Sequence, residues 1–162
     1  MTQDPQTDAG VFARLTAQAG PQRLALIGES HQRLLGRPLA DGESASAEAL
    51  WAAPMVILAH GTQSDPLFFY GNRQALALFE LTADQLSGLP SRLSAQPDSR
   101  QDRARLLDQV ARQGFIEDYA GVRVSRTGRL FRIEAATVWN LIDAQGRLHG
   151  QAAAFSRWTP LP

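Results

Sequence analysis

The residue types that most often carry out chemistry are few in this sequence and widely spaced. Cysteine is absent, which excludes thiolate nucleophiles, thiolate zinc sites, disulfides and cysteine-ligated iron–sulfur clusters. Histidine occurs only as His31, His60 and His149, without the clustering that a metal site needs. We expect His31 to be a buried core histidine and His60 to bond Asp65 across a turn. No nucleophile motif accompanies them, so no catalytic residue, metal ligand or enzymatic activity is predicted.

Eight polar or aromatic residues are nevertheless candidates for contact with a small ligand. Asn72 is either a polar ligand contact or a helix N-cap, and cap preference favours the second interpretation. Trp139 is expected to share a strand face with Phe131 and Ile133, where it forms either a ligand-binding wall or plain core. The full candidate set is Tyr70, Asn72, Ser91, Arg92, Tyr119, Trp139, Asn140 and Gln151.

A row of small residues in the last predicted strand bears on whether a ligand has room to bind. Gly150, Ala152 and Ala154 alternate onto one strand face. Such a row either leaves a concavity opposite large neighbours or lets a helix pack closely, and the sequence leaves both open. An enzyme on this scaffold would need Tyr119, His60 or similar polar groups to converge there with an acid such as Asp118.

Composition narrows the class of protein and its partners. The 162 residues are 44% hydrophobic, which fits a single domain with a substantial core. The net charge is zero and the 16 basic residues, all arginine, are scattered along the chain, so nucleic acid is not a predicted partner. The first ten residues do not resemble a signal peptide, and the longest apolar run, 54–59, is too short to cross a membrane. We therefore expect a cytoplasmic protein.

The N-terminal third is predicted to be a helical extension and a linker that precede the main domain. Residues 1–10 are expected to be a disordered tail, followed by helices over 11–19 and 21–35. Pro21 suits the first position of the second helix and Gly36 its end. Residues 36–47 are expected to form a linker, and 48–160 the main domain.

Alternation and capping signals then predict two strands, three helical segments and three more strands. The last helix should be capped by Asp98 or Ser99, with a buried stripe of Arg103, Leu107 and Val110 flanked by Leu106. The strands are expected over 55–60, 67–72, 116–125, 129–141 and 148–158. This order predicts an α+β fold, a five-stranded antiparallel sheet with helices on one face, preceded by the N-terminal helices.

The element order and several short motifs resemble a known family. Residues 67–93 resemble the strand, Asn-capped helix and glycine-ended turn of a PAS domain, and 115–155 resemble its three-strand meander. Within PAS-like domains the sequence is most similar to the MEKHLA domain. The motifs that carry this resemblance span 23–157 and include the segment 60–66, Tyr70-Gly-Asn, Leu78-Phe, Pro90-Ser-Arg, Gly114-Phe, Val138-Trp-Asn and Gly150-Gln-Ala.

The resemblance implies a sensory or partner-binding role and raises the question of a cofactor. Ser91 stands where flavin-binding light sensors of the PAS class carry a reactive cysteine, and Arg92 matches their phosphate-contacting arginine. Covalent flavin chemistry is therefore excluded, non-covalent flavin binding stays open, and Ile133 replaces an expected flavin-contacting asparagine. Heme is not expected, because residues 73–115 contain no histidine. The lead-in at 33–39 resembles stand-alone bacterial members.

Two functions follow as hypotheses. The first is a PAS-like sensor that binds a small organic molecule between its sheet and helices and signals through a partner or self-association. The second is a protein–protein adaptor with a filled core, which docks or dimerises through an N-terminal helix stripe of Leu24, Ile27, Leu34 and Leu35.

Overall fold

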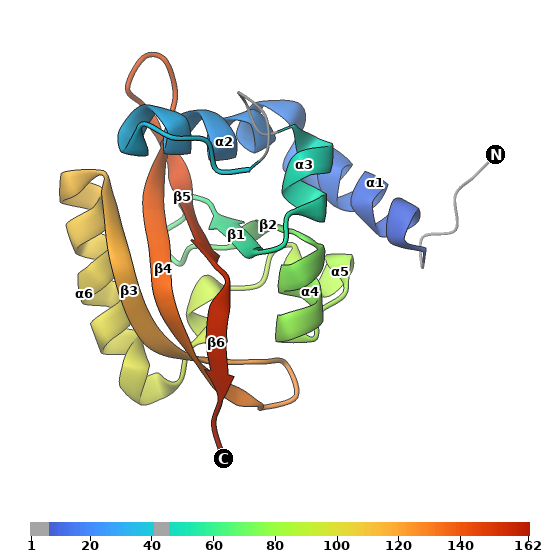
Figure 1. Ribbon diagram of the computed structural model, residues 1–162, viewed down its shortest axis with the longest axis vertical. Helices are drawn as coiled ribbons and strands as arrows, with labels where there is room; N and C mark the ends of the chain where they lie inside the picture. The colour runs from blue at the N-terminus through green and yellow to red at the C-terminus, as the bar shows by residue number, and fades with distance from the viewer. Residues whose placement is uncertain (1–6, 41–45) are drawn as a thin grey trace.

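The chain folds around one antiparallel sheet with the strand order β2-β1-β5-β4-β3 (Figure 1). A computed structural model describes residues 7–40 and 46–162. The strands are β1 (Val56–His60), β2 (Phe68–Gly71), β3 (Phe115–Val124), β4 (Leu130–Ile142), β5 (Leu148–Phe155) and β6 (Arg157–Pro160). The predicted α+β class and antiparallel sheet are confirmed.

β6 continues β5 rather than starting a new position in the sheet. β5 pairs with β4 at Thr137–Ala154, and β6 pairs with it at Glu134–Arg157, in one unbroken register. The single strand predicted over 148–158 is therefore interrupted only at Ser156, the residue that lies between β5 and β6.

Two short helices, a 3-10 turn and one long helix cover the face of the sheet that we call the inner face. They are α4 (Arg73–Phe79), α5 (Ala83–Leu86), the 3-10 turn η1 (Ser91–Ser94) and α6 (Pro97–Gln113), with α3 (Ala47–Ala52) beside α4. Asn72 caps α4 and Thr82 forms a capping box with Gln85, both as local sequence predicts. α6 begins at Pro97 and its N-cap is Gln96, so the predicted cap at Asp98 or Ser99 is wrong.

The N-terminal helices are part of the same packed structure. α1 (Asp8–Ala19) begins three residues before its expected start, and α2 (Pro21–Leu35) ends at Gly36 as predicted. α2 lies across β4 and β5 on the opposite, outer face of the sheet (Figure 1). α3 was not expected, since its residues fall at the end of the predicted linker, of which 41–45 lie outside the described residues.

Two compensating bulges make β4 change face in its middle. Between the pairs Ile116–Val138 and Tyr119–Ala136, β3 has an extra residue; between Tyr119–Ala136 and Gly121–Ile133, β4 has one. Ala135, inside the second bulge, has a positive φ of 53°. Side chains on either side of it therefore alternate in opposite phase.

This offset corrects the predicted face of Trp139. Phe131 and Ile133 lie in the inner core, where Ala136 and Val138 continue the face after the bulge. Trp139, by contrast, lies in the outer core with the small residues Ala152 and Ala154, under α2. Of the two roles left open for the small-residue row, close packing of a helix is the one that the structure shows.

Candidate functional site

A small cavity lies between the inner face of the sheet and α6. Its volume is about 50 Å³, and its walls come from β1, β2, β3, β4, β5, α4 and α6. Most of the wall is apolar, which includes Leu58, Phe68, Phe79, Leu106, Leu107, Val110, Ile116, Ile133, Val138, Ala153 and Phe155. The polar groups that interrupt it are His60, Ser94, Arg103, Tyr119, Arg123 and Gln151.

Tyr119 and Arg123 enter the cavity from alternate positions of β3. The Arg123 guanidinium is 6% exposed and donates a 2.5 Å hydrogen bond to the Tyr119 phenol oxygen. Gly121 lies between them, and a Cβ there would come within 2.9 Å of that oxygen, so glycine leaves the two side chains room to meet. Arg123 also donates to the Val122 carbonyl. Its positive charge has no carboxylate partner among the described residues.

Arg103 brings a second cation to the same cavity from α6. Burial lowers the pKa of its guanidinium to about 10, and the charge of Arg123 acts in the same direction. Within the described part of the chain, Arg103 has neither an ion pair nor a hydrogen bond. A buried guanidinium, Arg123, and a partly buried one, Arg103, therefore line a largely apolar cavity, and neither has a carboxylate partner among the described residues.

His60 contributes an acceptor at the β1 side of the cavity. Its Nδ1 lies 3.0 Å from the Gly61 carbonyl, which can only accept, so Nδ1 carries the proton and Nε2 is left as a bare acceptor. Nε2 is buried and has no partner among the described residues. Burial lowers the pKa of His60 to about 4, with a smaller effect from Arg103. The expected bond to Asp65 is wrong, because Asp65 pairs with Arg92 instead.

Asn140 and Gln151 join the cavity wall to α6. They face each other across β4 and β5, where Gln151 Nε2 donates to Asn140 Oδ1 over 3.0 Å and to the Leu107 carbonyl over 3.3 Å. Asn140 Nδ2 donates in turn to the Val110 carbonyl. These bonds satisfy buried amides and hold the second half of α6 against the sheet.

Among the predicted ligand contacts, only Tyr119 and Gln151 line the cavity. Asn72 is fully used in structure, since Oδ1 accepts from Ile57 and Ala75 N–H groups while Nδ2 donates to the Leu50 and Met55 carbonyls. The roles of Tyr119 and Gln151 in binding stay predictions.

Tyr70, Ser91 and Arg92 also lie away from the cavity lining. Tyr70 is buried in the outer core, where burial raises the pKa of its phenol, and neither its hydroxyl nor that of Ser91 has a partner among the described residues. Arg92 is exposed and donates to the Asp65 carboxylate over 3.1 Å.

The cavity does not fit a flavin. Drug-sized and cofactor ligands need pockets of roughly 300–1,000 Å³, against about 50 Å³ here. Ser91 and Arg92, the positions that the resemblance placed near a flavin, are not in its walls, and Ile133 offers no hydrogen bond to a ring. The three residues named for a possible enzymatic site do not come together in the cavity. Tyr119 and His60 line it, whereas Asp118 is exposed.

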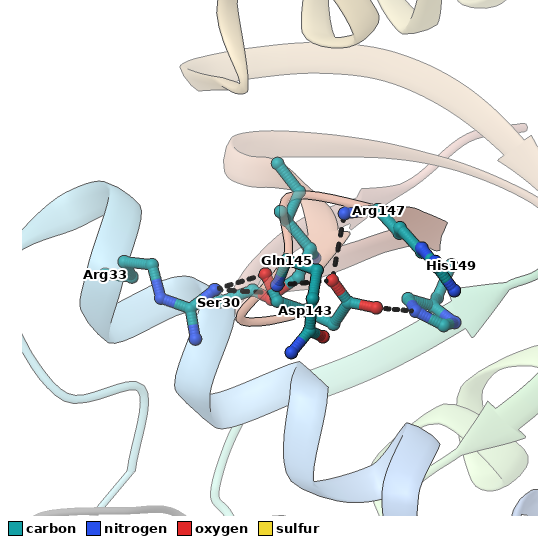
Figure 2. Close-up of polar contacts among 7 residues, drawn as sticks. Ser30, Arg33, Asp143, Gln145, Arg147 and His149 are labelled. Carbon is teal, nitrogen blue, oxygen red and sulfur yellow. Dashed lines mark hydrogen bonds and ion pairs between the residues drawn. The ribbon is translucent and has the colours of Figure 1, made fainter.

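On the outer face, α2 is hydrogen-bonded to the end of β4 and to the turn that follows it (Figure 2). Ser30 Oγ accepts from the Ile142 N–H over 2.9 Å and donates to its carbonyl over 3.2 Å, and Arg33 donates to the same carbonyl over 2.7 Å. Asp143 closes the turn, and its hydrogen bond with His149 at 2.7 Å lowers the pKa of the Asp143 carboxyl. Trp139 adds a bond from Nε1 to the Ile27 carbonyl.

Sequence reasoning placed Arg103 on a buried stripe and named His60 for an enzymatic site, but it overlooked Arg123. The signal for Arg123 is the spacing of Tyr119, Gly121 and Arg123, which puts all three on one strand face. Ala120, Val122 and Val124, which alternate with them along β3, are only partly buried.

Solved structures with a similar fold are PAS and light-oxygen-voltage domains. A PAS domain from Colwellia psychrerythraea has a TM-score of 0.58 and 16% identity, covering 67% of this chain and 89% of that one. A light-oxygen-voltage domain from a flavin-analogue study has a TM-score of 0.57 and 14% identity, covering 72% and 84%. At these identities the likeness establishes the fold alone: the chain has a PAS-like fold.

The family model of the MEKHLA domain matches residues 22–160, and the chain belongs to the MEKHLA domain family. The match begins inside α2, so the family includes the helix that covers the outer face. The resemblance drawn from the sequence motifs is confirmed.

Curated relatives are plant homeobox-leucine zipper proteins. HOX29 of Oryza sativa subsp. indica is 27% identical over 69% of this chain, and HOX32 of the same source is 26% identical over 82%. The chain spans only 13% and 16% of their lengths. These relatives give no support to the expected bacterial origin. None of the helices in the described residues is long and apolar enough to span a membrane.

Proposed function

We propose that this domain is a sensor module that binds a small organic molecule in the cavity between its sheet and α6. The observation that carries the proposal is the cavity itself, where several buried polar groups converge within apolar walls, as is typical of ligand sites. A filled core would have no use for unpaired polar groups, since each costs free energy to bury.

The signal is proposed to leave through α2 to a protein partner or a second copy of the chain. Gln151 lines the cavity and bonds Asn140, whose neighbour Trp139 contacts α2 on the other face. A ligand that moves this part of β4 would therefore change the packing of α2. The adaptor hypothesis loses support, because Leu24 and Ile27 of the proposed docking stripe are buried within this chain.

Native mass spectrometry of the purified chain, joined to a thermal-shift screen of small metabolites, tests ligand binding. The matched control is Ala153→Leu, because Ala153 lies on the cavity wall and a larger apolar side chain there fills it. We expect a compound that stabilises the natural chain and leaves the variant unchanged. Bare protein mass together with no stabilising compound would rule out the sensor function.

A further inference from the structure

We propose that the ligand of this cavity is a small hydroxylated carboxylate, with its carboxylate held by Arg103 and Arg123 and its hydroxyl by His60. This inference rests on the proposed function and names the chemical class of the ligand. It follows from the charge, size and hydrogen-bonding state of the cavity wall.

The charge of the site calls for an anion. Arg103 and Arg123 approach the cavity from different elements, α6 and β3, and neither has a carboxylate partner in the described residues. Bringing two like charges into an apolar interior is unfavourable unless a counter-charge is present. Guanidinium groups present forked N–H donors that match the two oxygens of a carboxylate. Tyr119, which accepts from Arg123, keeps its own O–H free to donate to the same anion.

The size and lining of the cavity favour a short organic acid over an inorganic anion. A single water needs roughly 10–15 Å³ of such space, so about 50 Å³ admits a ligand of only a few heavy atoms. The walls away from the arginines are aliphatic or aromatic and suit a short carbon chain. Inorganic phosphate has no apolar part to place against them.

His60 supplies an independent sign that a ligand donates a hydrogen bond here. The side chain is 7% exposed, and its buried Nε2 is an unprotonated acceptor without a partner among the described residues. A buried acceptor left unmatched costs free energy, which a ligand hydroxyl would recover. A carboxylate alone would place a second acceptor against it, so the hydroxyl distinguishes the proposed ligand from a plain fatty acid.

Calorimetric titration of the full chain with four probes tests the proposal. The probes are 3-hydroxypropionate, propionate, 3-hydroxypropionamide and inorganic phosphate, in a carboxylate-free buffer. We expect 3-hydroxypropionate to bind at least about tenfold more tightly than each of the others. Equal binding of the neutral amide would overturn the anionic ligand while leaving the sensor function intact, and preference for phosphate would overturn the carboxylate.

Two variants on one helix separate a binding role of Arg103 from a structural one. In Arg103→Met, 3-hydroxypropionate binding should weaken at least about tenfold, whereas Arg105→Met, at an exposed arginine paired with Asp102, should bind normally. Without ligand, Arg103→Met should unfold at a higher urea concentration than the natural chain, because an unbalanced buried cation is removed. A less stable Arg103→Met protein with unchanged affinity would show that Arg103 is structural and overturn the proposal.

Discussion

At the scale of single residues, the cavity is defined by groups whose polar atoms lack a protein partner. His60 Nε2 is a buried acceptor without a partner among the described residues, and the partly buried Arg103 side chain in the same wall has no hydrogen bond there. Buried polar atoms are almost always satisfied in folded proteins, so the free acceptor of His60 marks a place where another molecule can donate.

His60 should make the stability of the domain depend on pH. Its pKa is about 4 in the folded chain, against about 6.5 when unfolded. The unfolded chain therefore gains a proton first as pH falls, and stability that is complete above about pH 6.5 is lost towards pH 4. Between about pH 6.5 and 4.5 the loss from this group should reach roughly 2–3 kcal/mol. Urea unfolding at both pH values measures it, and a His60→Gln variant with the same pH slope would contradict the assignment.

Gly150 should tolerate no side chain. Its φ is 147°, and an added Cβ would lie 2.0 Å from the His60 carbonyl oxygen. We expect Gly150→Ala to destabilise the fold by at least about 2 kcal/mol in urea unfolding. Gly128→Ala is the control, since Gly128 has φ of 91° but nothing within 4 Å, and its cost should stay near 1 kcal/mol. Equal losses would show that backbone strain, not the clash, decides the effect.

At the scale of elements, the helices and strands can be predicted from local sequence signals. Asn72 and Thr82 cap their helices, Gly36 ends α2, and alternation marks the five main strands. The inward direction of Arg123 and the face of Trp139 could not be predicted, because both depend on bulges in the β3–β4 pairing. Ala135 and Asp118 have positive φ although neither is a glycine, so the sequence does not indicate where the bulges lie.

The attachment of α2 to β4 should depend on one hydroxyl. Ser30→Ala removes both hydrogen bonds to Ile142 and leaves its partly buried N–H without that acceptor. We expect a loss of about 2–3 kcal/mol in the free energy of unfolding. Glu29→Ala, at the exposed neighbouring position, should change stability by no more than about 0.5 kcal/mol. Similar losses for both variants would show that the Ser30 bonds do not hold the helix.

At the scale of the whole molecule, the N-terminal helices belong to the domain core. Ile27 of α2 and Leu50 of α3 share the outer core with Trp139. Short-range sequence signals predict that α2 exists, but its docking on the sheet requires contacts more than a hundred residues apart along the chain.

Removing residues 1–40 should therefore prevent folding rather than abolish only an interaction. The truncated chain would expose Trp139, Leu141 and the small-residue row, a contiguous apolar face prone to association. We expect aggregation, with loss of the near-ultraviolet circular dichroism of the buried tryptophan. A soluble truncated monomer with that signal intact would show instead that α1 and α2 are dispensable for the fold.

β4 separates the inner core from the outer core, and the offset at Ala135 sets which of its residues face each. Val138 and Trp139 are neighbours along the backbone, yet Val138 faces the cavity and Trp139 faces α2. A conformational change caused by a ligand in the cavity therefore has to cross only a single sheet to reach α2. No long relay through the molecule is required.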